Sequence, residues 1–165
     1  MSIDTLEDLY LEQLKDIYSA NKQALDVTKE MAKAATDTDL SDALRAGADG
    51  IQDGISAIEK ISEGHDESPS GEHCKGMEGL VKEARAHAIE ETFGEDATKD
   101  AMIITQYQRL THYAIAGYGC LAAFADRLEL DNDLTALNTC LDASYEGDRT
   151  MTALATGGIN SDAVA

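Results

Sequence analysis

Apolar residues recur along most of this chain at steps of three and four, the spacing that places side chains on one face of an α-helix. Polar stretches rich in Asp, Ser and Gly interrupt the pattern at four places and divide it into five segments. The segments predict helices over Thr5–Ala35, about residue 40 to Glu63, Lys75–Phe93, Thr98–Leu128 and Asp131–Ala155. The sequence therefore predicts an all-α fold, a four-helix bundle with one additional shorter helix between the second and third long helices.

Polar side chains mark the predicted helix ends. Asp4 or Thr5 is expected to cap the first helix, and Asp39 or Ser41 the second, because a side-chain oxygen there can accept a bond from a free backbone N–H. The last ten residues, 156–165, are small and mostly polar, and a flexible tail is expected there. Residues 1–155 are predicted to form a single domain.

Composition and charge narrow the classes of function. The formal net charge is −19, from 32 acidic and 13 basic residues. Such a surface repels phosphate backbones and anionic lipid, so neither a nucleic acid nor a membrane is expected as a partner. The acidity is interpreted either as a source of solubility or as an adaptation to a salt-rich cytoplasm.

Three features favour a cytoplasmic protein. The first residues lack the basic and apolar regions of a secretory signal. No stretch approaches the roughly 18 apolar residues of a membrane span. The three cysteines, Cys74, Cys120 and Cys140, are odd in number and widely spaced, which favours a reducing compartment over a disulfide framework or a zinc site.

Four long helices are also the usual frame of a di-iron or di-manganese protein. Such a site takes Glu from two helices and Glu-x-x-His from each of the other two. This chain contains no Glu-x-x-His. Midway along the predicted apolar faces lie the neutral residues Asn21, Gly47, Thr111, Ala114 and Ser144.

Several short motifs share their order and spacing with one family over nearly the whole length. They are Leu6-Glu7-Asp8-Leu9-Tyr10 with Asp16-Ile17-Tyr18, Met31-Ala32-Lys33-Ala34-Ala35, Cys74-x-x-Met77-x-Gly79-Leu80 with Glu83, His112-Tyr113, Ile115-Ala116-x-Tyr118-Gly119-x-Leu121 and Leu154-Ala155. The chain resembles the bacterial YciE/YciF-type ferritin-like stress proteins. The resemblance implies a ferritin-like bundle, induction under stress and a di-metal site in the family at large.

The same resemblance implies that this chain has lost the metal ligands. The family pattern has charged or imidazole side chains at six positions where this chain has small or neutral ones: Asn21, Gly47, Gly50, Thr111, Ala114 and Ser144. Neutral oxygens and absent side chains cannot balance two divalent cations. We therefore expect no metal and no cofactor there, and a former ligand cavity that has closed around small residues.

Three glycines of the second helix, Gly47, Gly50 and Gly54, bear on how that centre is filled. They allow either a close approach of helices or room for Tyr18, Tyr113 or Tyr118 in the centre. Chance substitution explains them equally well, because tertiary context overrides helix propensity.

His112 and Asp148 are the candidates for a remnant mononuclear site. His112 lies on the predicted fourth helix without a carboxylate one turn away, which favours a hydrogen-bonded histidine at a helix seam. Asp148 is an acidic residue on an otherwise inward stripe.

The first functional hypothesis is a non-catalytic, metal-free protein of stress-associated or structural role, forming a homodimer. The second is a diverged oxidoreductase with an iron or manganese site, or a radical site, relocated to Tyr113, Tyr118, His112 and Asp148. The third is an acidic module that recruits a basic protein partner.

Overall fold

The computed structural model describes residues 3–164 and is built of helices joined by short turns and one longer loop. The long helices are α1 (Leu6–Ala34), α2 (Thr38–Gly64), α4 (Asp96–Arg127) and α5 (Asp131–Leu154). The shorter α3 (Lys75–Ala84) continues as the π-helical segment η1 (Arg85–Glu90). A second π-helical segment, η2 (Ala155–Ile159), leads into the short α6 (Asn160–Asp162). The predicted all-α class and the extra shorter helix are confirmed.

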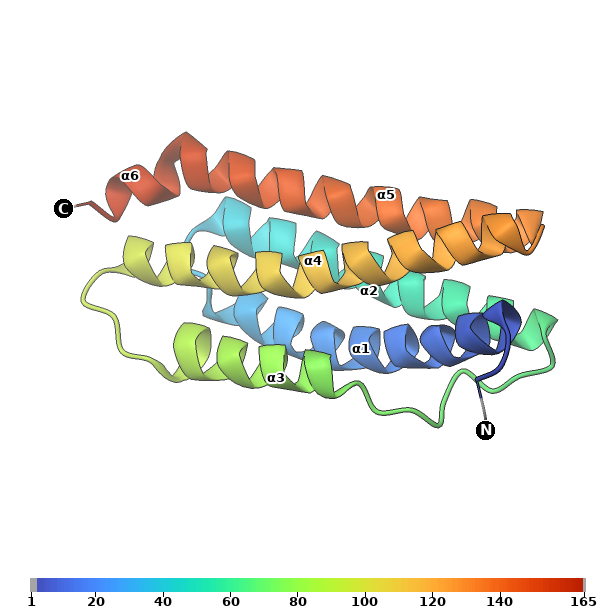
Figure 1. Cartoon of the computed structure of the whole chain (residues 1–165). Coiled ribbons are helices and arrows are strands. Elements are labelled where there is room, and N and C mark those ends of the chain that lie inside the picture. The colour runs from blue at the N-terminus through green and yellow to red at the C-terminus, as the bar shows by residue number, and fades with distance from the viewer. Residues whose placement is uncertain (1–2, 165) are drawn as a thin grey trace.

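The four long helices lie side by side as a bundle (Figure 1). The helix α1 packs on α2 and α4, and α5 packs on α4 and α2. The shorter α3 lies outside this bundle against α1 and α4. The loop between α2 and α3 runs back along the bundle, so α3 covers only one half of its length (Figure 1).

The first two helices begin at different kinds of cap. Thr5 forms a capping box with Asp8, because its hydroxyl accepts from the Asp8 N–H at 3.0 Å while its own N–H donates to the Asp8 carboxylate at 2.9 Å. The predicted cap of α2 at Asp39 or Ser41 is wrong. Asp37 is the cap and accepts from the Leu40 N–H at 2.8 Å.

The carboxylate of Asp100 explains the earlier start of α2. This buried side chain of α4 accepts bonds from the backbone N–H groups of Thr36 and Asp37, both at 2.8 Å, and from the Thr36 hydroxyl at 2.6 Å. These three bonds fix the turn between α1 and α2 so that the helix starts directly after Asp37.

Two other helix ends differ from the predictions. The third predicted helix ends at Glu90 rather than Phe93, and its last six residues are π-helical. The helical structure also continues beyond Ala155, where a tail was predicted to begin. A kink at Gly158 turns the chain so that Ile159 is buried in the core.

The core forms two main clusters along the bundle. One cluster surrounds Met31, Leu44 and Ile103, and the other surrounds Leu14, Ile58 and Leu121. The partly buried Tyr113 packs against both clusters.

Candidate functional site

A cavity of about 290 Å³ lies at the centre of the bundle. Its walls come from α1, α2, α3, α4 and α5. All six positions predicted to have lost metal ligands line it: Asn21, Gly47, Gly50, Thr111, Ala114 and Ser144. The structure thus brings together the residues that the sequence singled out. The prediction that the cavity had closed is wrong.

Two tyrosines of α4 that line the cavity reach the backbone of α2. A Cβ atom at Gly47 would overlap the hydroxyl of Tyr107, and one at Gly54 would overlap the hydroxyl of Tyr118. The rings therefore reach across to α2 through gaps that only glycine leaves. We expect them to act as spacers between α4 and α2, because smaller side chains would not span this gap.

Of the three tyrosines named as alternatives for this space, Tyr118 is the one that lies at a glycine of α2, Gly54. Tyr18 donates to Glu59 at 2.9 Å at the exposed side of α1 and α2. Tyr113 lies against Gly76 of α3. Tyr107 was missed as an occupant, although its place on the apolar stripe of α4, opposite the middle of α2, is the signal that could have found it.

The cavity tyrosines stay neutral. Burial raises the pKa of Tyr107, and burial is also the main reason why the pKa of Tyr118 is raised. Asn21 donates its side-chain amide to the Tyr118 hydroxyl at 2.6 Å, which acts in the opposite direction but does not outweigh burial. Neither phenol can act as a base near neutral pH.

Two hydroxyls of the wall donate to backbone carbonyls of their own helices. Thr111 donates its hydroxyl to the backbone carbonyl of Tyr107 at 3.0 Å, and Ser144 donates to that of Cys140 at 2.9 Å. The charged side chain of the lining belongs to Glu146, which is exposed. The wall therefore offers an apolar surface and no ionised donor at its centre.

These residues do not fit a di-metal group. Iron and manganese at such a centre require carboxylates and imidazoles, whereas the wall presents one amide, hydroxyls, the Cys140 thiol and, at its exposed edge, the single carboxylate of Glu146. Within residues 3–164, three or more His, Cys, Asp or Glu side chains are nowhere grouped closely enough to hold a metal ion.

His112 and Asp148 do lie together, but away from the cavity. The imidazole Nε2 of His112 is 3.0 Å from the Asp148 carboxylate, which also accepts from Gln108 at 3.1 Å. The His112 side chain is 63% exposed and that of Asp148 is 21% exposed. The pair joins α4 to α5 at the surface, and neither residue lines the cavity.

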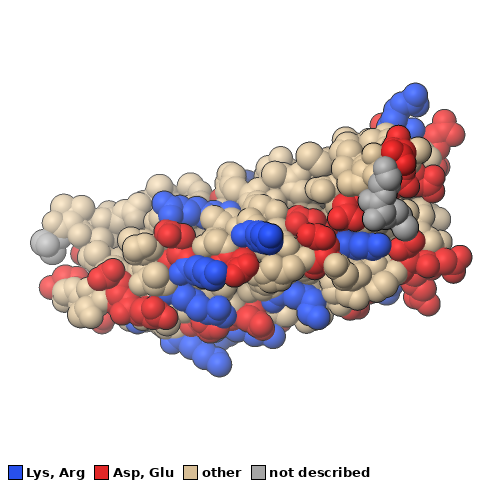
Figure 2. All heavy atoms as spheres, turned by 60° about the horizontal axis from the view of Figure 1, so that its bottom comes forward, with Lys and Arg blue, Asp and Glu red and all other residues tan. Residues whose placement is uncertain are grey.

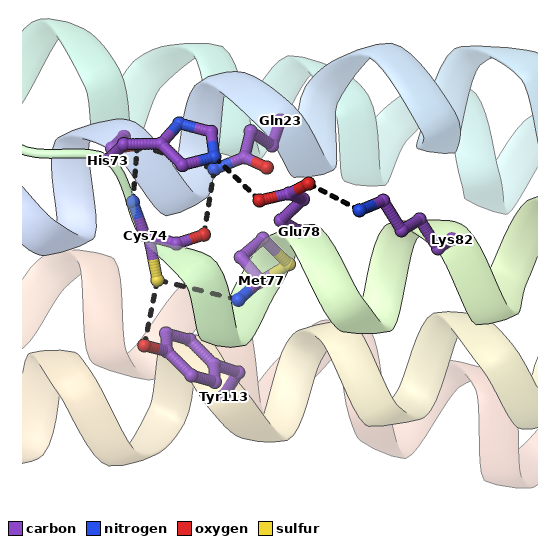
Figure 3. A network of polar contacts seen from close by, with 8 residues as sticks. Gln23, His73, Cys74, Met77, Glu78, Lys82 and Tyr113 are labelled. Carbon is purple, nitrogen blue, oxygen red and sulfur yellow. Dashed lines mark hydrogen bonds and ion pairs between the residues drawn. The ribbon is translucent and has the colours of Figure 1, made fainter.

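A second polar cluster surrounds Cys74 at the start of α3 (Figure 3). The thiol accepts from the Met77 N–H at 3.4 Å and lies 2.9 Å from the Tyr113 hydroxyl, which in turn donates to Asp16 at 3.0 Å. Gln23 of α1 donates to the backbone carbonyl of Cys74 at 3.0 Å. The cluster fastens α3 to α1 and α4.

The Cys74 cluster is structural rather than reactive. Burial is the main cause that raises the pKa of the thiol, so the nucleophilic thiolate is disfavoured. On the outer side of α3, Glu78 pairs with His73 and Lys82 (Figure 3). In the sequence, Cys74-x-x-Met77 was part of the family resemblance only; the structure shows Cys74 as the N-cap of α3, bonded to the Met77 N–H.

The fold and the bundle centre define a ferritin-like four-helix bundle. Residues 5–164 match the family described as a domain of unknown function, DUF892, and this chain belongs to that family. It is 30% identical to protein YciF of Escherichia coli over 164 residues, which cover 99% of this chain and 98% of that protein.

Two solved structures are similar to it. The crystal structure of the E. coli stress protein YciF has a TM-score of 0.89, with 30% identity, and the match covers 96% of this chain and 99% of that one. YcfI from Rhodopseudomonas palustris, described as a proposed structural protein, has a TM-score of 0.86 and 33% identity over 92% and 95% of the two chains. In the part of this chain that the structure describes, no helix is long and apolar enough to cross a membrane.

Proposed function

We propose that this protein is a non-catalytic, metal-free member of the family with a stress-associated or structural role. The observation that carries the proposal is the central cavity, where all six expected ligand positions lie together and carry neutral or no side-chain donors. A stress protein and a proposed structural protein are among its relatives.

Electrostatics is the physical basis of the proposal. Two divalent cations in this apolar centre would leave positive charge without compensation, and an unpaired buried charge costs several kcal/mol. Removal of the whole carboxylate set also avoids the opposite cost, because buried carboxylates without a metal repel each other.

Metal analysis of protein purified from cells supplied with iron and manganese tests the proposal. We expect less than about a tenth of an equivalent of either metal, because the ligands are absent. Manganese added to the purified protein is expected to leave its melting temperature unchanged. Stoichiometric, tightly held iron or manganese would contradict the proposal.

A variant with four carboxylates restored to the cavity wall is the matched control. It carries Asn21→Glu, Thr111→Glu, Ala114→Glu and Ser144→Glu, and all four positions line the cavity. Its melting temperature is expected to rise with added manganese, because a metal that binds only the folded state stabilises it.

The oxidoreductase hypothesis has less support. Tyr118 contacts Asn21, Tyr113 contacts Cys74 and Asp16, and His112 with Asp148 lies at the surface. These residues do not converge on one reacting position. We expect no ferroxidase or peroxide-consuming activity. If the parent protein showed such an activity and His112→Ala abolished it, the oxidoreductase hypothesis would be favoured instead.

Charge on the surface favours solubility over a docking role. On the face shown in Figure 2, basic side chains lie among acidic ones rather than apart from them. Opposite charges also pair between elements, as in Arg85–Glu30 at 2.8 Å between η1 and α1.

The homodimer stays a prediction. Among the described residues, the large apolar side chains that are exposed are Ile3, Tyr145 and Val164, which is a small basis for a dimer interface. Light scattering of the purified protein will give its mass in solution.

A further inference from the structure

The central cavity has the size and the wall of a binding site for a small molecule. From its volume, its lining and its opening, we infer that it binds an uncharged apolar molecule about as large as two fused aromatic rings. The inference rests on the proposed function, since a metal pair would bring charge into the same space.

Volume sets the size of the ligand. The cavity measures about 290 Å³. An engineered apolar cavity of about 150 Å³ stays dry and takes up benzene. The central cavity is about twice as large and lies near the lower end of natural ligand pockets, at roughly 300 Å³.

The wall sets the chemistry of the ligand. Apolar groups cover most of it, among them the side chains of Ala24, Ile51, Met77, Leu110 and Met151 and the rings of Tyr107 and Tyr118. The hydroxyl protons of Thr111 and Ser144 and one amide proton of Asn21 are already donated to protein oxygens. Among the residues that the structure describes, the lining holds no Lys, Arg or His to balance an anion, which would give up its water on entry, whereas an apolar molecule has no such hydration to lose.

An opening between α2 and α5 gives access. The exposed residues of the lining are Ala46 and Gly50 on α2, and Ala143 and Glu146 on α5. The three small residues leave a passage between the two helices. Glu146 at its edge repels an anionic ligand and leaves a neutral one unaffected.

Methionine methyl groups provide the direct test. Met77 and Met151 line the cavity, whereas Met31 is buried elsewhere in the core and Met102 lies outside the lining. Naphthalene is titrated into metal-free protein with 13C-labelled methionine methyls, in the presence of a chelator. The expected result is a saturable ring-current shift of the Met77 and Met151 signals, with those of Met31 and Met102 unmoved.

Two cavity variants and one control show where the probe binds. Ser144→Leu and Gly50→Leu add a side chain at the cavity wall, and each is expected to weaken naphthalene binding at least about 10-fold, as loss of space for several ligand atoms does. A Cβ at Gly50 meets no neighbouring atom, and the same holds for the exposed Gly79 of α3, which is not part of the lining. Gly79→Leu is therefore the matched control and is expected to bind as tightly as the parent.

Each alternative outcome is decisive. Absence of a shift up to the solubility of naphthalene, shifts shared by Met31 and Met102, or equal binding by naphthalene-2-sulfonate would overturn the inference. Because the sample is metal-free by preparation, such a failure leaves the proposed function standing. Metal found in the protein as purified would overturn the proposed function instead.

Discussion

The side-chain amide of Asn21 donates a 2.6 Å hydrogen bond to the hydroxyl of Tyr118, and both residues are buried. The bond joins α1 to α4 along the wall of the central cavity. The same hydroxyl occupies the space that Gly54 leaves on α2. One tyrosine of α4 thereby contacts both α1 and α2, which is how we account for a centre of neutral residues that has stayed open.

Loss of this hydroxyl is expected to destabilise the protein. Tyr118→Phe leaves the buried Asn21 amide without its acceptor, which costs about 1–3 kcal/mol. Tyr18→Phe is the control, because its bond to Glu59 lies at the surface, and we expect a loss below about 0.5 kcal/mol. Urea unfolding measures both. Equal effects of the two variants would contradict the role assigned to Tyr118.

Alanine substitutions at two glycines of α2 are expected to change stability in opposite directions. Gly50→Ala should stabilise the protein by about 0.5–1 kcal/mol, because a Cβ there meets no other atom and helix propensity improves. Gly47→Ala should destabilise it, because the new Cβ would displace the Tyr107 hydroxyl. Thermal unfolding of the two variants checks the prediction. Stabilisation by Gly47→Ala would show that Tyr107 does not hold this position.

The buried carboxylate of Asp100 is expected to be among the most sensitive positions. Asp100→Ala removes the acceptor of three bonds from Thr36 and Asp37, and hydrogen bonds to charged groups contribute about 1.5–3 kcal/mol each. A loss of at least about 3 kcal/mol is expected in urea unfolding. Asp96→Ala, at the exposed first turn of the same helix, should cost less than about 1 kcal/mol.

Much of the fold could be predicted because its signals are local. The apolar period gives the five main helices, and the Thr5 capping box lies within four residues. The cap at Asp37 could not be found in this way, since Asp100, more than sixty residues away in the chain, selects it. The burial of Ile159 likewise depends on a kink that directs it into the core.

The candidate site shows the same limit. Helix period was enough to place Asn21, Thr111 and Ser144 at one level of the bundle, and they do line one cavity. Whether that level closes or stays open depends on the distance between helices. We assign this distance to Tyr107 and Tyr118, which lie against glycines of another helix. Helix period does not tell which residues of two helices come into contact, so this pairing could not be predicted.

Stability is expected to fall steeply in alkaline solution. Burial is the largest cause that raises the pKa of each of Tyr10, Tyr107 and Tyr118 above the ordinary value of 10.0. A raised pKa in the folded state gives stability that is complete below the unfolded value and is lost as pH rises above it. Above about pH 10, each tyrosine that is protonated in the folded state but ionised in the unfolded state lowers the free energy of unfolding by about 1.4 kcal/mol per pH unit.

Urea unfolding measures this loss between about pH 8 and about pH 11, a range that includes the ordinary tyrosine pKa. Tyrosinate absorbance provides a second signal. Tyr118→Phe should make the free energy of unfolding fall less steeply with pH, by the contribution of a single tyrosine. Tyr145→Phe, which changes an exposed side chain, should leave the slope unchanged. A slope that Tyr118→Phe does not alter would contradict the neutral, buried state of this phenol.

Filling the cavity distinguishes an open centre from one that collapses in solution. Ser144 donates its hydroxyl only to the Cys140 carbonyl of its own helix, so Ser144→Leu leaves no partner stranded. If the space of about 290 Å³ persists, the new side chain fills part of it and raises the free energy of unfolding by about 0.5–2 kcal/mol. If the helices close over the centre, the same change overpacks the core and costs about 1–3 kcal/mol. Chemical unfolding gives the sign, and we expect the gain. Together with weaker naphthalene binding, a gain would mean that the parent chain keeps, at the expense of stability, a space that packing alone would have removed.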